Sequence, residues 1–98
     1  MKKYILYKHT FPNGKVYIGI TSKNTAELRW KKGRGYSTQE RMAKAIKEFG
    51  WDNIKHEILL SNIPEEEVTR IEQETISFYK SNNPQYGYNI LSGGLDSF

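Results

Sequence analysis

Residues 4–21 read Tyr-Ile-Leu-Tyr-Lys-His-Thr-Phe-Pro-Asn-Gly-Lys-Val-Tyr-Ile-Gly-Ile-Thr, with two β-prone runs on either side of a compact turn signal. Tyr, Ile, Leu and Val favour a pleated, half-buried surface, Pro12 presets a turn φ, and Gly14 accepts the positive φ that turns often need. The stretch therefore predicts a β-hairpin. Both of its arms carry tyrosines, which are Tyr4, Tyr7 and Tyr17.

The composition indicates one soluble globular domain over residues 1–98, with a tail after about residue 94 expected to fray. Hydrophobic residues make up 37% of the chain and charged residues 27%, which are ordinary values for a folded soluble protein. No apolar run approaches the roughly 20 residues of a membrane helix, and Lys8 interrupts the N-terminal apolar stretch too early for an export signal. Because the chain has no cysteine, disulfides and thiolate zinc sites are excluded, and we expect a cytoplasmic location without membrane association.

Basic and acidic residues are segregated along the chain. Residues 28–47 hold seven basic side chains against Glu40, whereas residues 52–74 hold seven acidic ones against Lys55 and Arg70. Clustered Lys and Arg neutralise phosphates, so the basic segment points to a nucleic-acid partner, with a merely solvated helix face as the alternative. The acidic segment leaves docking of a protein partner open. The candidate phosphate contacts are Lys15, Lys31, Lys32, Arg34, Arg41, Lys44 and Lys47.

Two helices are predicted directly after the hairpin. Residues 26–32 contain good helix formers, and Gly33 is expected to end this first helix. Ser37 and Glu40 match a capping box, so we expect the second helix to start at residue 37 and to close at Gly50. Its apolar residues recur at three- and four-residue spacing and are Met42, Ala45, Ile46 and Phe49.

A third strand and a third helix complete the predicted α+β fold. Residues 54–60 suit a strand with one face largely buried, and Pro64 followed by three glutamates predicts a helix running to about Lys80. Residues 87–89 are expected to add a short strand or to brace the sheet. The expected architecture is a small three-stranded sheet, made of the hairpin and the third strand, flanked by about three helices.

Glu72 is out of place on the third predicted helix. Val68, Ile76 and Tyr79 form the inward stripe of that helix, and Glu72 falls in the middle of the stripe. A carboxylate in an apolar face is costly unless it is paired or holds a metal ion. The pattern leaves two interpretations open: a structural Glu72 bonded to a neighbouring arginine, and a functional ligand.

The order of these blocks resembles the GIY-YIG nuclease family over nearly the whole chain. The family includes homing endonucleases, some restriction enzymes, phage nucleases and excision-repair subunits, and its fold is a small mixed three-stranded sheet flanked by helices. The resemblance therefore implies that fold and metal-dependent endonuclease activity on DNA. The matching blocks are Ile5-Leu6-Tyr7, Gly14-Lys15-Val16-Tyr17-Ile18-Gly19, Leu28-Arg29-Trp30, Glu72, Gly87-Tyr88-Asn89 and Gly93-Gly94.

The resemblance also implies roles for individual residues. Tyr7 and Tyr17 would be the paired active-site tyrosines, and Arg29 the catalytic arginine. Glu72 would hold one divalent metal ion, Mg²⁺ or Mn²⁺, and Asn89 would be a supporting residue.

Departures from the family pattern bear on the site. The first block reads Ile-Leu-Tyr where the family name has Gly-Ile-Tyr, which removes no catalytic atom. Many members carry a histidine or tyrosine a few residues after the arginine. Gly33 stands four residues after Arg29, so Tyr36 is the nearest candidate for this catalytic position. For His9 an exposed strand position is preferred over a site role, and His56 is expected to be structural.

The chemistry implied is hydrolysis of a phosphodiester by in-line attack of water. A metal ion on Glu72 would neutralise charge on the scissile phosphate and the leaving 3′ oxygen, and Arg29 would stabilise the pentacovalent transition state. Tyr7 or Tyr17 can activate the water only if its pKa falls from about 10, which a nearby cation can cause.

The resemblance also sets a geometric expectation, which is that Tyr7, Tyr17, Arg29 and Glu72 line one concave surface. Its rim would carry Arg41, Lys44 and Lys47. If Glu72 lay on the opposite side of the sheet from Tyr17, the nuclease assignment of these residues would fail.

A catalytically silent DNA- or RNA-binding module is the alternative. In that case Trp30, Tyr36 and Trp51 would stack on bases while the basic residues hold phosphates. Double-stranded DNA is the expected partner, and DNA versus RNA, nicking versus double-strand breakage and the oligomeric state stay open. Site-specific family members usually append a DNA-recognition region after the Gly-Gly, so both a catalytic domain of a longer protein and a small enzyme of low specificity fit the sequence.

Overall fold

The computed structural model describes residues 2–90, which form an α+β fold. A three-stranded sheet flanked by three helices confirms the predicted fold class. The predicted frayed tail and Gly93-Gly94 lie outside the described residues. None of the helices within residues 2–90 combines the length and apolar character needed to cross a membrane. In chain order the elements are β1 (Lys3–Thr10), β2 (Val16–Thr21), α1 (Ala26–Trp30), the 3₁₀ segment η1 (Lys31–Tyr36), α2 (Glu40–Phe49), the 3₁₀ turn η2 (Trp51–Asn53), β3 (Lys55–Pro64) and α3 (Glu65–Tyr79).

The predicted hairpin is confirmed and supplies the central strand of the sheet. The strand order is β2-β1-β3 with both pairings antiparallel, so the sheet is antiparallel rather than mixed as predicted. A parallel bridge between Val16 and Gly87 lies outside the strand pairings. The Gly14 amide donates to the Phe11 carbonyl at 2.8 Å, and Gly14 has a φ of +86°. The turn therefore uses the glycine for the positive φ that the sequence predicts.

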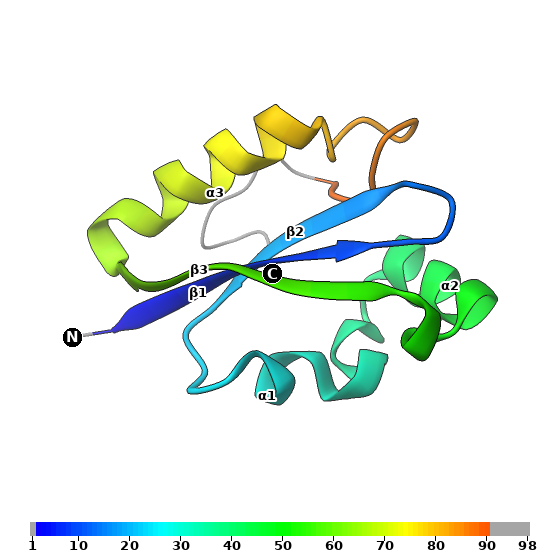
Figure 1. Ribbon diagram of the computed structural model, residues 1–98, viewed down its shortest axis with the longest axis horizontal. Coiled ribbons are helices and arrows are strands. Elements are labelled where there is room, and N and C mark those ends of the chain that lie inside the picture. Colours follow the sequence, from blue (N-terminus) through cyan, green and yellow to red (C-terminus); the bar gives the residue numbers. More distant parts are fainter. Residues whose placement is uncertain (1, 91–98) are drawn as a thin grey trace.

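The two faces of the sheet are covered by different helices, with α3 on one face and α1 and α2 on the other (Figure 1). Side chains alternate along a strand, so Leu6 and Ile18 pack towards α3 while Tyr7 and Tyr17 pack towards α1 and α2. The chain thus builds two small hydrophobic cores, and the one against α1 and α2 is rich in aromatic rings.

The segment between α1 and α2 differs from the sequence prediction. The first helix ends at Trp30 rather than at residue 32, because Lys31 and Lys32 both adopt positive φ. The predicted capping box at Ser37 is wrong: α2 begins at Glu40, and its N-cap residue makes no side-chain capping bond. The irregular η1 turns bring Tyr36 into the core with 0% exposure, and this burial offsets the loss of regular helix.

The third strand is longer and more exposed than predicted. It spans Lys55–Pro64, and the expectation of a largely buried face is wrong for Ile58 and Leu60, which are 48% and 47% exposed. β3 pairs with β1 alone, so it is an edge strand with neighbours on one side only. The predicted helix after Pro64 and the closure of α2 by Gly50 are confirmed.

Gly19 lies directly opposite Tyr7 in the β1–β2 register, and we expect the Gly19→Ala substitution to destabilise the fold by about 1–3 kcal/mol. An ideal Cβ at this position would lie 2.5 Å from both Cζ and Oη of Tyr7. The Tyr7 ring is packed against Trp30 and His9, so it cannot move aside freely. Chemical denaturation measures the effect. In a Tyr7→Leu background the same substitution should cost clearly less, and equal costs in the two backgrounds would contradict this explanation.

Candidate active site

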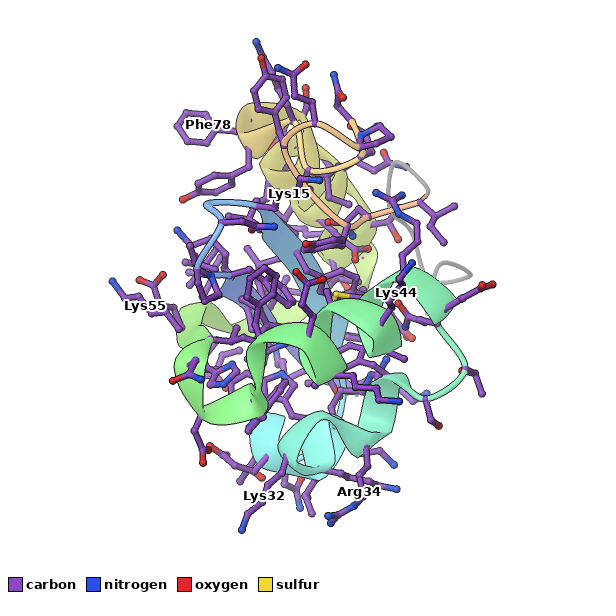
Figure 2. The ribbon with its side chains drawn as sticks, turned by 90° about the vertical axis from the view of Figure 1, so that its right-hand side faces the viewer. Lys15, Lys32, Arg34, Lys44, Lys55 and Phe78 are labelled. Atoms are coloured by element: carbon purple, nitrogen blue, oxygen red, sulfur yellow. The ribbon has the colours of Figure 1, made fainter. Side chains whose placement is uncertain are left out.

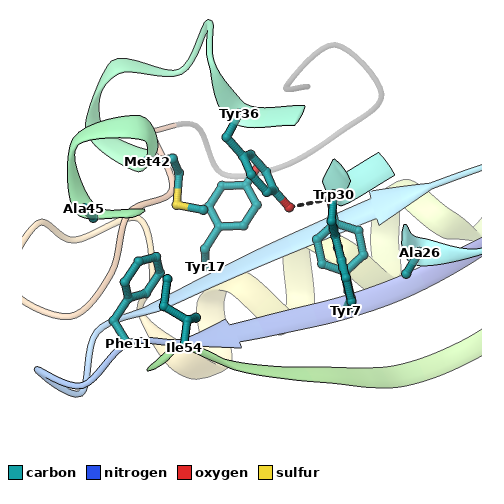
Figure 3. Close-up of a cluster of buried hydrophobic side chains, with 9 residues drawn as sticks. All are labelled: Tyr7, Phe11, Tyr17, Ala26, Trp30, Tyr36, Met42, Ala45 and Ile54. Carbon is teal, nitrogen blue, oxygen red and sulfur yellow. Dashed lines mark hydrogen bonds between the residues drawn. The ribbon is translucent and has the colours of Figure 1, made fainter. Parts of the chain in front are cut away.

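Three of the predicted site tyrosines meet on the α1 and α2 side of the sheet. Tyr7 comes from β1, Tyr17 from β2 and Tyr36 from the end of η1, and their exposures are 1%, 4% and 0% (Figure 3). The hydroxyl oxygens of Tyr7 and Tyr36 are hydrogen-bonded at 3.2 Å, and the rings of Tyr17 and Tyr36 lie edge to face with centroids 5.4 Å apart. The structure thus brings together the paired tyrosines and the third candidate tyrosine.

Arg29 joins this tyrosine cluster from α1. Its guanidinium carbon lies 4.6 Å from the centroid of the Tyr36 ring, and its Nη1 donates to the Gly35 carbonyl at 2.6 Å. The side chain is half-buried, so its charge acts through a medium less polarisable than water. Accordingly, Arg29 lowers the pKa values of Tyr7, Tyr17 and Tyr36, although this effect is smaller than that of burial.

Glu72 comes from the other layer. It lies on α3, which packs on the sheet face opposite Tyr17, so the expectation that all four residues line one surface is not met by the backbone. Its side chain is nevertheless buried at 2% exposure, and its charge raises the pKa values of Tyr7 and Tyr17. Arg29 and Glu72 therefore act on the same two phenols with opposite signs.

Burial dominates the protonation of the tyrosines. It raises the pKa of Tyr7 far above 10 and also raises those of Tyr17 and Tyr36, because a phenolate loses its hydration in the core. This direction is opposite to the fall that a simple tyrosine base requires. In the structure as it stands, all three tyrosines are therefore protonated at neutral pH.

The sequence interpretation of His9 as an exposed strand residue is wrong. His9 is 0% exposed, its Nε2 lies 2.7 Å from the Tyr36 hydroxyl, and its Nδ1 lies 2.9 Å from Nδ1 of His56. The Nε2 of the half-buried His56 in turn lies 3.0 Å from the Trp51 carbonyl oxygen. His9 is two residues after Tyr7, so strand alternation alone places both on one face, and this signal could have revealed its position.

Asn89 has a structural position beside the tyrosines. Its side-chain amide bonds both main-chain groups of Ile18 at 2.9 Å, with Oδ1 accepting from the amide and Nδ2 donating to the carbonyl. The Tyr88 amide also donates to the Val16 carbonyl at 2.9 Å. The segment 87–89 thus braces the outer edge of β2, as the sequence predicts, and this bracing fixes the strand that carries Tyr17.

The candidate phosphate contacts divide into separate groups. Lys15, Arg41 and Lys44 line one surface hollow of about 280 Å³ together with Tyr88 and Glu48. Lys32 and Arg34 lie far from Lys15, at the η1 end of the molecule (Figure 2). Arg41 is half-buried and donates to the Gly87 carbonyl at 2.9 Å, so part of its hydrogen-bonding capacity is used within the protein. The exposed members are Lys31, Lys32, Arg34, Lys44 and Lys47.

The metal ion that the resemblance implies is Mg²⁺ or Mn²⁺, and Glu72 is the carboxylate that would hold it. Within residues 2–90, no group of three or more His, Cys, Asp or Glu side chains is placed to hold a metal ion. Mg²⁺ usually keeps several waters and binds through one or two carboxylates plus substrate phosphates. Among residues 2–90, Glu72 is the one carboxylate that is fully buried, and one carboxylate is compatible with such an ion.

Two of the aromatic residues considered for base stacking are part of the core. Trp30 is 6% exposed and Tyr36 is 0% exposed, whereas Trp51 is half-buried and stacks on His56 with ring centroids 3.9 Å apart. Trp30 and Tyr36 are therefore not available to stack on a nucleobase, and Trp51 already stacks on His56.

No protein-family model, curated protein or solved structure matches the chain.

Proposed function

We propose that the protein is a metal-dependent endonuclease that hydrolyses DNA phosphodiester bonds, as the resemblance to GIY-YIG nucleases implies. The observation that supports it most is the packing of Tyr7, Tyr17 and Tyr36 against one another, with the Arg29 guanidinium 4.6 Å from the centroid of the Tyr36 ring. Phosphoryl hydrolysis needs charge stabilisation and proton transfer, for which a cation, a carboxylate and hydroxyl groups are suitable side chains.

Each residue has a distinct part in the proposed reaction. Glu72 would hold the metal ion, and bound Mg²⁺ supplies neutralisation of charge on the phosphate and on the leaving 3′ oxygen. The Arg29 guanidinium stabilises the extra negative charge of the pentacovalent transition state. Tyr7 or Tyr17 accepts a proton from the attacking water. Because Tyr7 and Glu72 are almost fully buried, DNA binding must open the cluster locally.

The hollow lined by Lys15, Arg41 and Lys44 supports a phosphate-binding role next to the cluster. Lys15 Nζ lies 5.6 Å and Arg41 Cζ 6.0 Å from the centroid of the Tyr88 ring, so the two cations are held on one aromatic side chain. Tyr88 belongs to the same brace that carries Asn89 along β2. A DNA backbone seated in the hollow would therefore run close to the strand that bears Tyr17.

The non-catalytic binding module is the weaker alternative. It would bind bases through Trp30, Tyr36 and Trp51, and these rings are packed in or against the core. It also gives no reason for a carboxylate in the apolar stripe of α3, where Val68 and Ile76 lie on either side of Glu72.

Supercoiled plasmid incubated with the purified protein tests the function. We expect nicked and linear products in Mg²⁺ or Mn²⁺ and none in excess EDTA, because the ion neutralises charge that builds up on the phosphate. Cleavage should return when Mg²⁺ is added back in excess of the chelator. Retardation of DNA on a gel without any cleavage in Mg²⁺ or Mn²⁺ would contradict the nuclease and favour the binding module.

A further inference from the structure

A continuous hydrogen-bonded chain runs from Tyr7, through Tyr36 and His9, to the half-buried His56. The successive separations are 3.2 Å between the two hydroxyls, 2.7 Å from the Tyr36 hydroxyl to His9 Nε2, and 2.9 Å between the two Nδ1 atoms. We propose that Tyr36, His9 and His56 form a proton relay that takes the hydroxyl proton of Tyr7 while Tyr7 accepts one from the attacking water. This inference rests on the proposed nuclease function and assigns the water-activating role to Tyr7.

The donor-to-acceptor direction of these hydrogen bonds follows from the bond between His56 and the Trp51 carbonyl. The Trp51 carbonyl can only accept, so His56 Nε2 carries the hydrogen of that 3.0 Å bond and the Nδ1 of a neutral His56 is an acceptor. His9 Nδ1 must then be the donor between the two rings, which leaves His9 Nε2 to accept from the Tyr36 hydroxyl. The two hydroxyl oxygens lie 3.2 Å apart, a distance at which either can donate. Because the one Tyr36 hydrogen is used towards His9 in this scheme, we infer that Tyr36 accepts from Tyr7 at rest. Every bond of the chain therefore points from Tyr7 towards His56.

The proposed step moves one proton along each bond. The attacking water gives a proton to the Tyr7 oxygen, the former Tyr7 proton passes to Tyr36, the Tyr36 proton to His9 Nε2, and the His9 Nδ1 proton to His56 Nδ1. The resulting hydroxide forms the new bond to phosphorus as the bond from phosphorus to the 3′ oxygen breaks. That oxygen takes a proton from solvent, and the His56 imidazolium releases its extra proton to solvent. After the transfer all four hydrogen bonds remain, with the three bonds from Tyr7 to His56 reversed in direction.

The relay removes the difficulty that burial poses for a tyrosine base. No free phenolate needs to exist, because the Tyr7 oxygen gains one proton as it loses another. Different charged groups influence the pKa values at the two ends of the relay. Arg29, Glu72 and Tyr17 influence the pKa of Tyr7, whereas Asp52 influences that of His56. Burial lowers the pKa values of both His9 and His56, so both are neutral at physiological pH and can carry a proton in this direction.

The position of His56 suits the exit of the relay. His9 is fully buried and has no route to water of its own, whereas His56 is half-buried on the edge strand β3. Tyr36 and the two histidines do not touch the substrate in this scheme. They act through Tyr7, and they are therefore positioning and proton-relay residues rather than catalytic ones.

Plasmid cleavage by Tyr36→Phe and His56→Ala variants tests the relay. We expect kcat to fall roughly 100-fold in each variant with little change in KM, which is the lower end of the range for loss of proton transfer. The wild-type rate should rise with pH through the His56 pKa, which lies below 6.5, and His56→Ala should lose that rise. Imidazole in the buffer should restore part of the His56→Ala rate in proportion to its neutral fraction. A purely structural histidine would show neither the change in pH profile nor this rescue.

Tyr4→Phe is the matched control, because it removes a buried tyrosine hydroxyl, bonded to Glu65 at 3.2 Å, on the α3 side of the sheet. It should cleave at the wild-type rate. Long-range ¹H–¹⁵N NMR adds a readout that needs no cleavage, with His9 expected as the Nδ1–H tautomer and His56 as the Nε2–H tautomer. Wild-type kcat and pH profile in both relay variants, or the opposite tautomers, would overturn the relay while leaving the nuclease intact. A wild-type protein that never cuts DNA would instead overturn the proposed function.

Discussion

Replacing Glu72 with glutamine is expected to lower the rate of Mg²⁺-dependent DNA cleavage by roughly 1,000-fold. Charge stabilisation by a bound metal ion contributes several kcal/mol to a transition state, and about 1.4 kcal/mol corresponds to a tenfold change in rate. Glutamine keeps the length and shape of the side chain in the buried stripe between Val68 and Ile76 but removes its negative charge. The measurement is the initial nicking rate of supercoiled plasmid over a Mg²⁺ titration, with circular dichroism confirming that the variant is folded.

The matched control for Glu72 is Glu74→Gln on the same helix. Glu74 is exposed and pairs with Arg70 at 3.0 Å, so its loss should cost less than about 1 kcal/mol of stability and leave cleavage unchanged. If excess Mg²⁺ restores the Glu72→Gln rate, the carboxylate contributes mainly to metal affinity. Equal rates for wild type and Glu72→Gln at every Mg²⁺ concentration would remove Glu72 from the metal site.

The parts of the fold that the sequence predicts well are those set by local signals. The Pro12 to Gly14 turn, the closure of α2 at Gly50 and the start of α3 after Pro64 each depend on one or two residues whose backbone preferences are strong. The failure at Ser37 has a physical reason of the same kind. The capping signal is weaker than the burial of Tyr36, and the irregular η1 turns that place this ring in the core also delay the start of α2 to Glu40.

The candidate site depends on pairings that no local signal contains. His9 is opposite both Tyr17 and His56 in the strand register, and this register follows from β1 lying between β2 and β3. Alternation along the strand predicts that His9 lies on the same face as Tyr7. It does not predict that His56 is the hydrogen-bond partner of His9. Likewise, the out-of-place Glu72 is visible in the helix pattern, whereas its position across the sheet from the tyrosine side chains requires the layer order.

Acid is expected to unfold the protein through His9 before its carboxylates are protonated. Burial, helped by His56 and Arg29, holds the pKa of His9 well below 6.5 in the folded state, while in the unfolded chain it is near 6.5. Between these two values the unfolded state binds more protons, so stability is complete above pH 6.5 and falls as the pH decreases. The slope reaches up to about 1.4 kcal/mol per pH unit for His9, and the smaller lowering of the His56 pKa adds to it near pH 6.

Urea denaturation at closely spaced pH values between 5 and 8 measures this slope, in a range where ordinary carboxylates contribute little. His9→Gln should be less stable than wild type at pH 8, because the glutamine amide replaces an imidazole that bonds both Tyr36 and His56. Its stability should nevertheless depend less on pH, so the two curves converge towards pH 5. Parallel curves would mean that His9 takes up a proton inside the folded protein. A protonated His9 would also leave Tyr36 without its proton acceptor, so such an outcome would count against the relay as well as against the predicted acid sensitivity.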